Sequence, residues 1–234
     1  MNTALRSAPL ALLPLLTLLF AAGPAAASER GKFSHEASFT MASQRVLGEP
    51  FPDILADDRG AMSPMGFRLG VGISGPFSVI GGYQNDLQGT TIDIPDTEVD
   101  IVQQLHLHQV LAGVKVQQPI RPWVAPYATL QLSAVRGVMR LDEDLNRDDN
   151  LNQLTSRGNA IGGVAAVGID LRPLKVGPAR LGTHLEVGYG LHSRLQLEAG
   201  DESQPVQDAA GDPALQGELL LRGLAVHWGV GLRF

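Results

Sequence analysis

The stretch LAVHWGVGLRF, residues 224–234, alternates strictly between bulky apolar side chains and small or polar ones. A period of two is typical of a β-strand, because successive side chains of a strand point to opposite faces. The two faces of this strand therefore meet different surroundings, and one of these surroundings is apolar. The apolar face consists of Leu224, Val226, Trp228, Val230, Leu232 and Phe234.

Seven further segments alternate in the same way and are predicted to be strands. In one of them the apolar positions change phase, from Leu105 and Leu107 to Val110 and Val114. One extra residue in a strand produces such a change, so we expect a β-bulge near Gln109. The predicted strands are residues 33–41, 66–73, 77–85, 104–116, 123–138, 161–171 and 181–192, which together with residues 223–234 make eight.

The connections between these strands fall into two classes that alternate along the chain. Short turns contain proline and basic residues, with Lys115 beside one of them, and lie at residues 75–76, 117–122 and 172–180. Long connections hold most of the 24 acidic residues and lie at residues 44–64, 85–102, 141–159 and 198–217. Short turns at one end and long polar loops at the other are typical of outer-membrane barrels with an even number of strands.

The chemistry of the two faces indicates which one points into the barrel. An apolar interior would leave glycine, alanine, histidine and isolated acids outside, whereas soluble strands normally expose lysine, glutamate and threonine. The small face fits the narrow lumen of an eight-stranded barrel instead. The apolar face of the last two strands has no charge, as lipid requires, since Arg or Lys at the bilayer midplane costs roughly 2–4 kcal/mol. We therefore predict an all-β fold, an eight-stranded antiparallel up-and-down transmembrane β-barrel with long acidic extracellular loops and short periplasmic turns.

The first residues have the layout of a secretory signal peptide. Arg6 precedes an apolar run over residues 10–20, and three alanines precede Ser28. An uncleaved membrane anchor is the alternative, but Pro14 interrupts the run, which is shorter than the roughly 20 residues of a spanning helix. We expect a signal peptide at residues 1–27 and one barrel domain at residues 28–234.

The composition excludes several classes of function. The chain has no cysteine, which excludes thiol catalysis and thiolate metal sites. Its formal net charge of -6 argues against a nucleic-acid partner. We expect a monomer without a cofactor.

Charged and titratable side chains gather on the face that is predicted to line the lumen. Buried charges must be paired or hydrated. These residues therefore form either a structural network that plugs the barrel or a gate in a water-filled path for small solutes. The abundance of glycine on this face favours open space. The candidate lumen residues are Glu36, Arg68, Asp170, His184, Glu186 and His227.

Two segments, RPWVAPY at residues 121–127 and GGVAAVGID at residues 162–170, are similar to stretches of small eight-stranded outer-membrane barrels of the OmpA, OmpX and OmpW type. The resemblance covers residues 28–234. The strand that ends with Phe234 resembles the targeting strand that the barrel-assembly machinery recognises. The resemblance implies Sec-type export through the periplasm to the outer membrane of a diderm bacterium, and contact with outer-membrane lipid and lipopolysaccharide. We expect no periplasmic domain of the OmpA type, and no functional motif of a single member carries over.

Metal and catalytic sites are weaker hypotheses. Two histidines on one strand face, such as His106 and His108, lie roughly 6–7 Å apart, too far to share an ion without further ligands; His184 and His192 are a second candidate pair. Residues 142–150 resemble a calcium loop but lack its glycine and terminal glutamate. The acidic loops could still recruit divalent cations that bridge to lipopolysaccharide. His192 and Ser193 resemble the histidine and serine of a lipid A deacylase. Adjacent residues of a strand point to opposite faces, so these two cannot form a pair of nucleophile and base.

The sequence favours an integral outer-membrane barrel with a structural, adhesive or narrow-passage role, no catalytic residue and no metal. The first alternative is an OmpW-like channel for small or hydrophobic solutes. The second is a lipid-A-modifying hydrolase, and a soluble periplasmic ligand carrier is the third.

Overall fold

The computed structural model describes residues 35–45, 47–49, 61–93, 99–145, 153–201, 204–205 and 215–234. The predicted signal peptide lies outside these residues and stays a prediction. Among the described residues, no helix is long and apolar enough to span a membrane. The eight long strands are β1 (His35–Arg45), β4 (Met65–Ser74), β5 (Phe77–Asp93), β6 (Val99–Gln117), β7 (Val124–Leu145), β8 (Gln153–Val176), β9 (Ala179–Asp201) and β11 (Leu215–Arg233). Three short strands are β2 (Leu47–Glu49), β3 (Ala61–Met62) and β10 (Gln204–Pro205).

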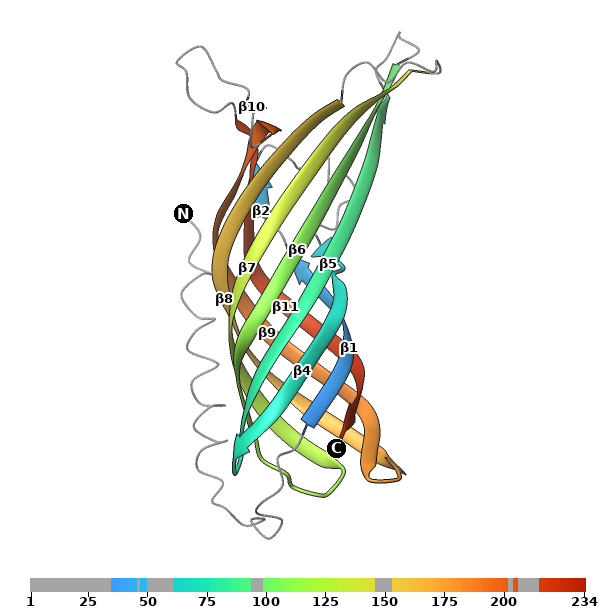
Figure 1. Ribbon diagram of the computed structural model, residues 1–234, viewed down its shortest axis with the longest axis vertical. Helices are drawn as coiled ribbons and strands as arrows, with labels where there is room; N and C mark the ends of the chain where they lie inside the picture. The colour runs from blue at the N-terminus through green and yellow to red at the C-terminus, as the bar shows by residue number, and fades with distance from the viewer. Residues whose placement is uncertain are drawn as a thin grey trace.

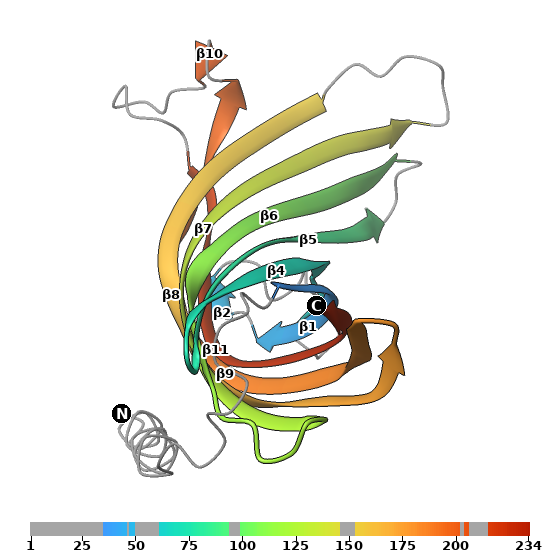
Figure 2. The same ribbon diagram turned by 60° about the horizontal axis from the view of Figure 1, so that its bottom comes forward.

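The eight long strands form a closed antiparallel ring (Figures 1 and 2). Each strand pairs with its neighbour in the chain, and β11 pairs both with β9 and with β1, where Phe39 lies opposite Val230. Backbone bonds between His35 and Phe234, at 2.9 and 3.3 Å, fasten the two ends of the ring together. The predicted eight-stranded up-and-down barrel is therefore confirmed.

The bulky apolar side chains point out of the ring. Leu224 is 57% exposed and Trp228 is 47% exposed, and Val187 on β9 is exposed as well. Outward apolar residues continue over residues 181–191 of β9 and 224–234 at the C-terminus, which matches the about 9–11 residues of a tilted membrane-spanning strand. A soluble carrier would place these side chains inside, so the exterior is that of a transmembrane barrel.

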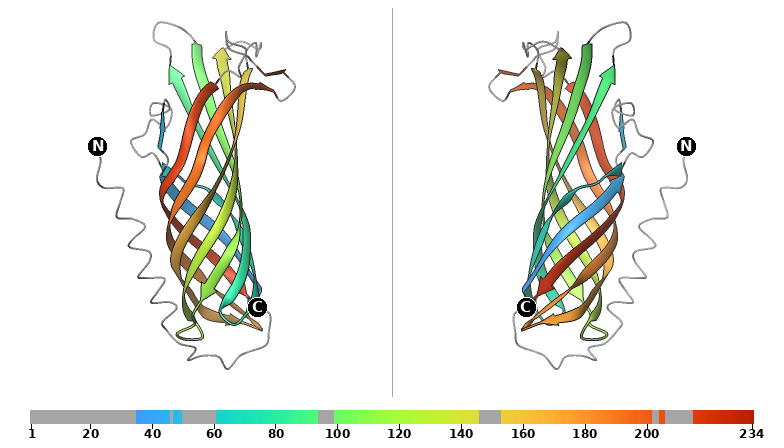
Figure 3. Two further views of the ribbon diagram at one scale, coloured as in Figure 1. Left: turned by 90° about the vertical axis from the view of Figure 1, so that its left-hand side faces the viewer. Right: turned by 90° about the vertical axis from the view of Figure 1, so that its right-hand side faces the viewer.

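The short turns and the C-terminus lie at the same end of the barrel (Figure 3). Two of these turns are Gly-Pro pairs, in which Gly75 and Gly177 have φ angles of +54° and +59°. This left-handed conformation carries no steric penalty for glycine. One boundary was wrong: residues 172–176 belong to β8 rather than to a turn.

At the opposite end the strands are much longer than predicted. Most of the predicted loops at 85–102, 141–159 and 198–217 is strand, because β5 reaches Asp93, β7 reaches Leu145 and β9 reaches Asp201. These strands project far beyond β1 and β4 (Figures 1 and 3). The physical reason is an apolar inner face, which allows the extended sheet to bury surface. The buried cluster comprises Leu105, Leu107, Val135, Met139, Ala160, Leu195, Leu197, Leu219 and Leu221.

The polarity of the wall therefore inverts along its height. In the membrane the apolar side chains face outward, whereas in the projecting part they face inward. On β6, Leu105 is 7% exposed and Val110 is 57% exposed. The pairing of β6 with both neighbours runs without interruption, so the bulge predicted near Gln109 was wrong. The phase change in the sequence reports a change of environment and not an extra residue.

A bulge does occur on β9. His192 pairs with Gly162 and Glu198 pairs with Arg157, which leaves one extra residue on β9 between these pairs. The extra residue turns the strand over, so that Leu191 is 53% exposed while Leu195 is fully buried at 0%. Because both leucines occupy the same phase in the sequence, only an inserted residue can send them to opposite faces.

The orientation of the wall can be tested on β9. We expect Leu185→Arg to lower the free energy of unfolding by roughly 2–4 kcal/mol, because it places a charge in the middle of the lipid-facing surface. Gln196→Arg, on the exposed face above the apolar belt, should change it by at most about 1 kcal/mol. Urea unfolding in lipid vesicles, followed by tryptophan fluorescence, measures both. Equal effects of the two substitutions would contradict the assigned membrane boundary.

Candidate functional site

The lumen near the short turns holds four charged side chains in direct contact. The ammonium group of Lys115 donates to Glu36 at 2.9 and 3.1 Å and to Asp170 at 2.9 Å. The Nη2 atom of Arg172 donates to Glu36 at 3.1 Å and to both oxygens of Asp170 at 3.0 and 3.1 Å. Two carboxylates thus face two cations, and we call these four residues the lower ion cluster. Its formal charge is balanced, as burial of ions requires.

Neighbouring side chains complete the surroundings of the lower ion cluster. The amide nitrogen of Gln117 donates to Asp170 at 2.9 Å, and Arg233 donates to the amide oxygen of Gln117 at 2.9 Å. The ammonium group of Lys115 also lies 4.4 Å from the centre of the Tyr127 ring, a cation–π distance. The network therefore joins β6, β7, β8 and β11 as well as β1.

A second cluster comprises Arg68, Glu186 and His227, and we call it the upper ion cluster. The guanidinium group of Arg68 donates to both oxygens of Glu186, at 2.9 and 3.2 Å, in the two-bonded geometry that suits a planar fork. The Nδ1 atom of His227 lies 3.4 Å from Glu186 and 3.5 Å from Arg68. All three side chains are buried.

A layer of neutral polar residues lies where the lumen changes from polar to apolar. The Nδ1 atom of His192 donates to the carbonyl oxygen of Leu221 at 2.9 Å, and its Nε2 atom bonds the hydroxyl group of Ser133. Gln109 donates to the same hydroxyl group at 3.1 Å. The apolar cluster begins directly beyond this layer. On β6, Leu107 is the next residue on the inner face after Gln109 in the direction away from the short turns, and Leu221 belongs to the cluster itself.

The inward glycines do not leave the lumen empty, contrary to the expectation of open space. A Cβ atom on Gly168 would lie 2.6–2.7 Å from the ring end of Tyr127, and one on Gly70 would collide with the side chain of Glu36. Such distances are shorter than real contacts between carbon atoms allow. The small residues therefore provide the clearance that the large lumen residues occupy.

The structure places five of the six predicted lumen residues in the two ion clusters. Glu36 and Asp170 belong to the lower one, and Arg68, Glu186 and His227 belong to the upper one. His184 is buried against Gly229. Its Nε2 atom has no hydrogen-bond partner among the described residues.

Sequence reasoning missed Lys115 and Arg172 because it counted Lys115 among the basic residues beside a short turn and placed Arg172 within one. Their phase was the available signal. Lys115 alternates with the outward residues Val114 and Val116, and Arg172 shares the phase of Asp170. Each cation therefore had to point into the lumen, where it balances a carboxylate.

The weaker candidate sites do not assemble among the described residues. There, no group of three or more histidine or carboxylate side chains is placed to hold a metal ion. His108 points outward, and its Nδ1 atom lies 2.6 Å from the hydroxyl group of Tyr83. The hydroxyl group of Ser193 accepts a bond from the backbone of Ile161 at 3.0 Å, on the side of β9 away from His192. In the calcium-like stretch at 142–150, residues 146–150 lie outside the described residues and residues 142–145 have no described side chains.

The contribution of the lower ion cluster can be measured with one lysine and a control. We expect Lys115→Met to lower the free energy of unfolding by roughly 3–5 kcal/mol, because it leaves two buried carboxylates with one cation. Lys175→Met removes the same charge from an exposed position near the turn between β8 and β9 and should change it by at most about 0.5 kcal/mol. Urea titration of both variants in the same detergent gives the comparison. A loss for Lys115→Met no larger than that of the control would show that the cluster does not stabilise the barrel.

Comparison with known proteins gives matches in structure only. No protein-family model matches the chain, and no curated protein is similar to it in sequence. Among solved structures it is similar to Ail, the attachment invasion locus protein of Yersinia pestis, with 15% identity, coverage of 87% of this chain and 100% of Ail, and a TM-score of 0.46. It is also similar to the outer membrane protein OprG of Pseudomonas aeruginosa, with 12% identity, coverage of 86% and 95%, and a TM-score of 0.44.

Neisserial surface protein A is a third similar structure, with 14% identity, coverage of 87% of this chain and 97% of that protein, and a TM-score of 0.40. All three are small eight-stranded outer-membrane barrels, the type of barrel that the sequence resembles. At these identities and TM-scores the similarities say nothing about what this chain binds.

Proposed function

We propose that this protein is an integral outer-membrane barrel of a diderm bacterium that seals its own lumen and has a structural or adhesive role without catalysis. The observation that carries the proposal is the pair of ion clusters whose bonds cross the lumen. The lipid-facing exterior and the resemblance of the sequence support placement in the outer membrane.

The ion pairs cross the lumen rather than lining one wall. Glu36 on β1 and Lys115 on β6 lie three strands apart around the ring, and so do Arg68 on β4 and Glu186 on β9. A bond between distant strands occupies the space between them. Two such crossings lie at different heights, and the buried ring of Tyr127 packs against Lys115. Together they support a lumen closed to ions and small polar solutes.

The projecting strands support a role at the cell surface. Six strands continue beyond the membrane, and five of them, β6, β7, β8, β9 and β11, contribute the nine residues of an apolar inner face. Burial of this cluster stabilises the extended wall, because each fully buried aliphatic side chain contributes roughly 1.5–3 kcal/mol. The wall places the described upper ends of its strands well away from the bilayer, where a partner outside the cell could reach them.

The sealed lumen makes a direct prediction for planar bilayers. We expect the full barrel to show no stepwise ion conductance, and we expect Arg68→Leu to stay silent as well, because the lower ion cluster still closes the lumen. The same substitution should lower the thermal stability, since it leaves Glu186 buried without its cation.

Steady conductance steps in the unaltered protein would contradict the sealed lumen. Steps that appear only in Arg68→Leu would instead identify the upper ion cluster as a gate. Lys175→Met, which does not touch the lumen, serves as the control in the same bilayers.

A passage for small apolar molecules is the second candidate function. The apolar cluster favours it, because leucines line the inside of the projecting wall above the polar lumen. If the protein is such a passage, proteoliposomes should take up an apolar dye while they remain impermeable to ions. A barrel with structural or adhesive function does not take up the dye faster than protein-free vesicles.

The remaining alternative is hydrolysis of lipid A. Ser133 and His192 form a hydroxyl–imidazole pair of the kind that nucleophilic enzymes use, but both are buried inside the barrel, away from the lipid-facing surface. We therefore expect mass spectra of lipid A from cells with and without the protein to be identical. Loss of an acyl chain that depends on Ser133 would contradict a non-catalytic role.

A further inference from the structure

Three basic residues lie side by side at the short-turn end of the sheet. Arg180 on β9 pairs with Lys175 on β8 and with Arg233 on β11, so the three residues form one row across neighbouring strands. Side chains of directly opposite residues lie on the same face, with their Cβ atoms about 4.5–5.5 Å apart. We call Lys175, Arg180 and Arg233 the cationic row.

The cationic row belongs to the inner face of the sheet. Lys175 alternates with Leu174 and Val176, which are exposed on the outer face, and Arg180 shares the phase of the buried His184. The last pair between β7 and β8 comes before the row. The row therefore lies just below the lumen, at the end where the short turns and the C-terminus are found (Figure 3).

The acidic side chains of the chain do not balance the cationic row. Of the 24 acidic residues, 20 lie at positions 49–58, 86–100, 142–149 and 198–218, in or beside the strand ends at the opposite end of the barrel. The other four are Glu29, Glu36, Asp170 and Glu186. The last three of these already pair within the two ion clusters. Glu29 lies in residues 1–34, which also contain three basic residues and therefore add no negative charge.

The short-turn end also has more hydrogen-bond donors than acceptors. Arg233 donates to the amide oxygen of Gln117 at 2.9 Å. Lys175 is exposed, Arg180 is half-buried, and neither forms an ion pair with another described residue. The Nη1 atom of Arg172 is buried without an acceptor among the described residues. Lys175 and Arg180 are therefore the members of the row that a ligand can engage.

A ligand of the cationic row comes from the periplasm and not from the bilayer. Lipid touches the outer face of the sheet, whereas the row belongs to the inner face. The lower ion cluster closes the lumen above the row, so a ligand does not arrive from the other end. The nearest fixed polyanion on this side of an outer membrane is the cell wall, whose peptides carry free carboxylates.

We propose that the cationic row binds carboxylate groups of the cell-wall peptides and so attaches the lower end of the barrel to the wall. Like charges on directly opposite residues destabilise a sheet, and an anion placed between them relieves the repulsion. An arginine can donate two parallel hydrogen bonds to one carboxylate, and a row across three strands is about 10 Å wide. The inference rests on the proposed placement in the outer membrane, which turns the short turns toward the periplasm.

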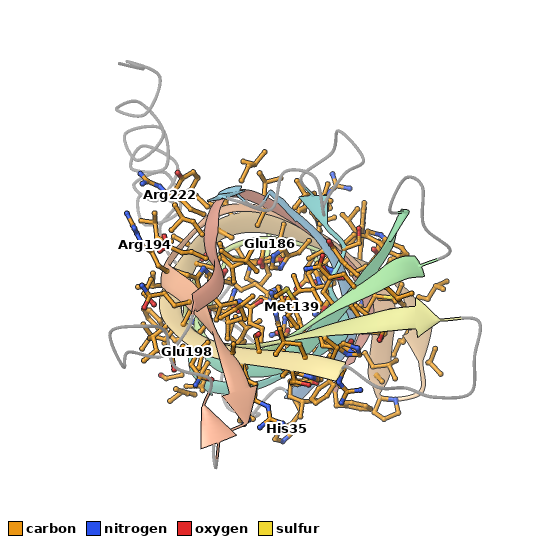
Figure 4. The ribbon with its side chains drawn as sticks, turned by 90° about the horizontal axis from the view of Figure 1, so that it is seen from above. His35, Met139, Glu186, Arg194, Glu198 and Arg222 are labelled. Carbon is orange, nitrogen blue, oxygen red and sulfur yellow. The ribbon has the colours of Figure 1, made fainter. Side chains whose placement is uncertain are left out.

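The test measures co-sedimentation of the detergent-solubilised full chain with purified peptidoglycan sacculi. The row variant, Lys175→Gln with Arg180→Gln, removes two charges. The first control, Arg194→Gln with Arg222→Gln, removes two charges from the outside of the ring at the other end, where Figure 4 shows both side chains. The second control, Arg121→Gln, removes an exposed charge at the same end but outside the row. Heat-dependent mobility in gels shows whether each barrel is folded, and Arg180→Gln alone replaces the row variant if it is not.

We expect the row variant to bind sacculi about tenfold more weakly than the unaltered protein, because loss of one exposed ion pair weakens binding by up to about fivefold and this variant loses two. Both controls should bind normally. Sacculi whose carboxyl groups have been converted to neutral amides should bind the unaltered protein as weakly as intact sacculi bind the row variant. Equal binding of the row variant and the controls would overturn the proposal, and so would full binding to amidated sacculi.

A soluble short-chain lipid distinguishes the cell wall from an anionic headgroup. Dihexanoyl phosphatidylglycerol at micromolar concentration should not displace the protein from sacculi. Displacement would assign the row to lipid phosphates and overturn the proposal. These outcomes are independent of conductance: a failure to bind sacculi leaves the sealed lumen standing, and an open lumen leaves the binding of sacculi standing.

Discussion

Hydrocarbon offers no hydrogen-bond partner to the peptide backbone, and the rest of this structure depends on that constraint. A sheet in lipid must therefore close, and here closure is the pairing of β1 with β11 from Glu36 to Gln44. The exterior then has to be apolar, because an exposed charge at the midplane is costly. What remains for the inner face is a narrow space in which polar and charged side chains can satisfy one another.

The ion clusters follow from the same constraint. Once the ring is closed, residues far apart in the chain face each other at short range, as Arg68 and Glu186 do. Neither charge is tolerable alone at that depth, so each residue on one wall requires its counterpart on another. The glycines opposite these large side chains belong to the same arrangement, because Gly70 and Gly168 lie where Glu36 and Tyr127 need room. The two ion clusters therefore combine residues of β1, β4, β6, β8, β9 and β11.

Sequence periodicity predicted the strands, their direction and the orientation of their faces, because each of these depends on residues close together in the chain. It did not predict how far the strands continue, since the apolar residues change sides between Leu107 and Val110 without a change of register. On β6 the apolar residues change phase although the pairing is regular. On β9 the apolar residues keep one phase although the strand contains a bulge. The pairing of ions across the ring could not be predicted from the sequence either, although the phase of Lys115 and Arg172 indicated that their side chains point into the lumen.

The unequal length of the strands gives the molecule a direction in the plane of the membrane. The described parts of β1 and β4 end low, whereas the wall from β5 to β11 continues upward around the rest of the circumference. A neighbour that diffuses in the bilayer therefore meets a different profile on each side of the barrel. A cylinder with a wall of equal height all round could rotate about its axis without consequence for such encounters, whereas the described part of this barrel has a tall side and a low side. Its rotational orientation relative to its neighbours is thus a physical variable that lateral crowding can select.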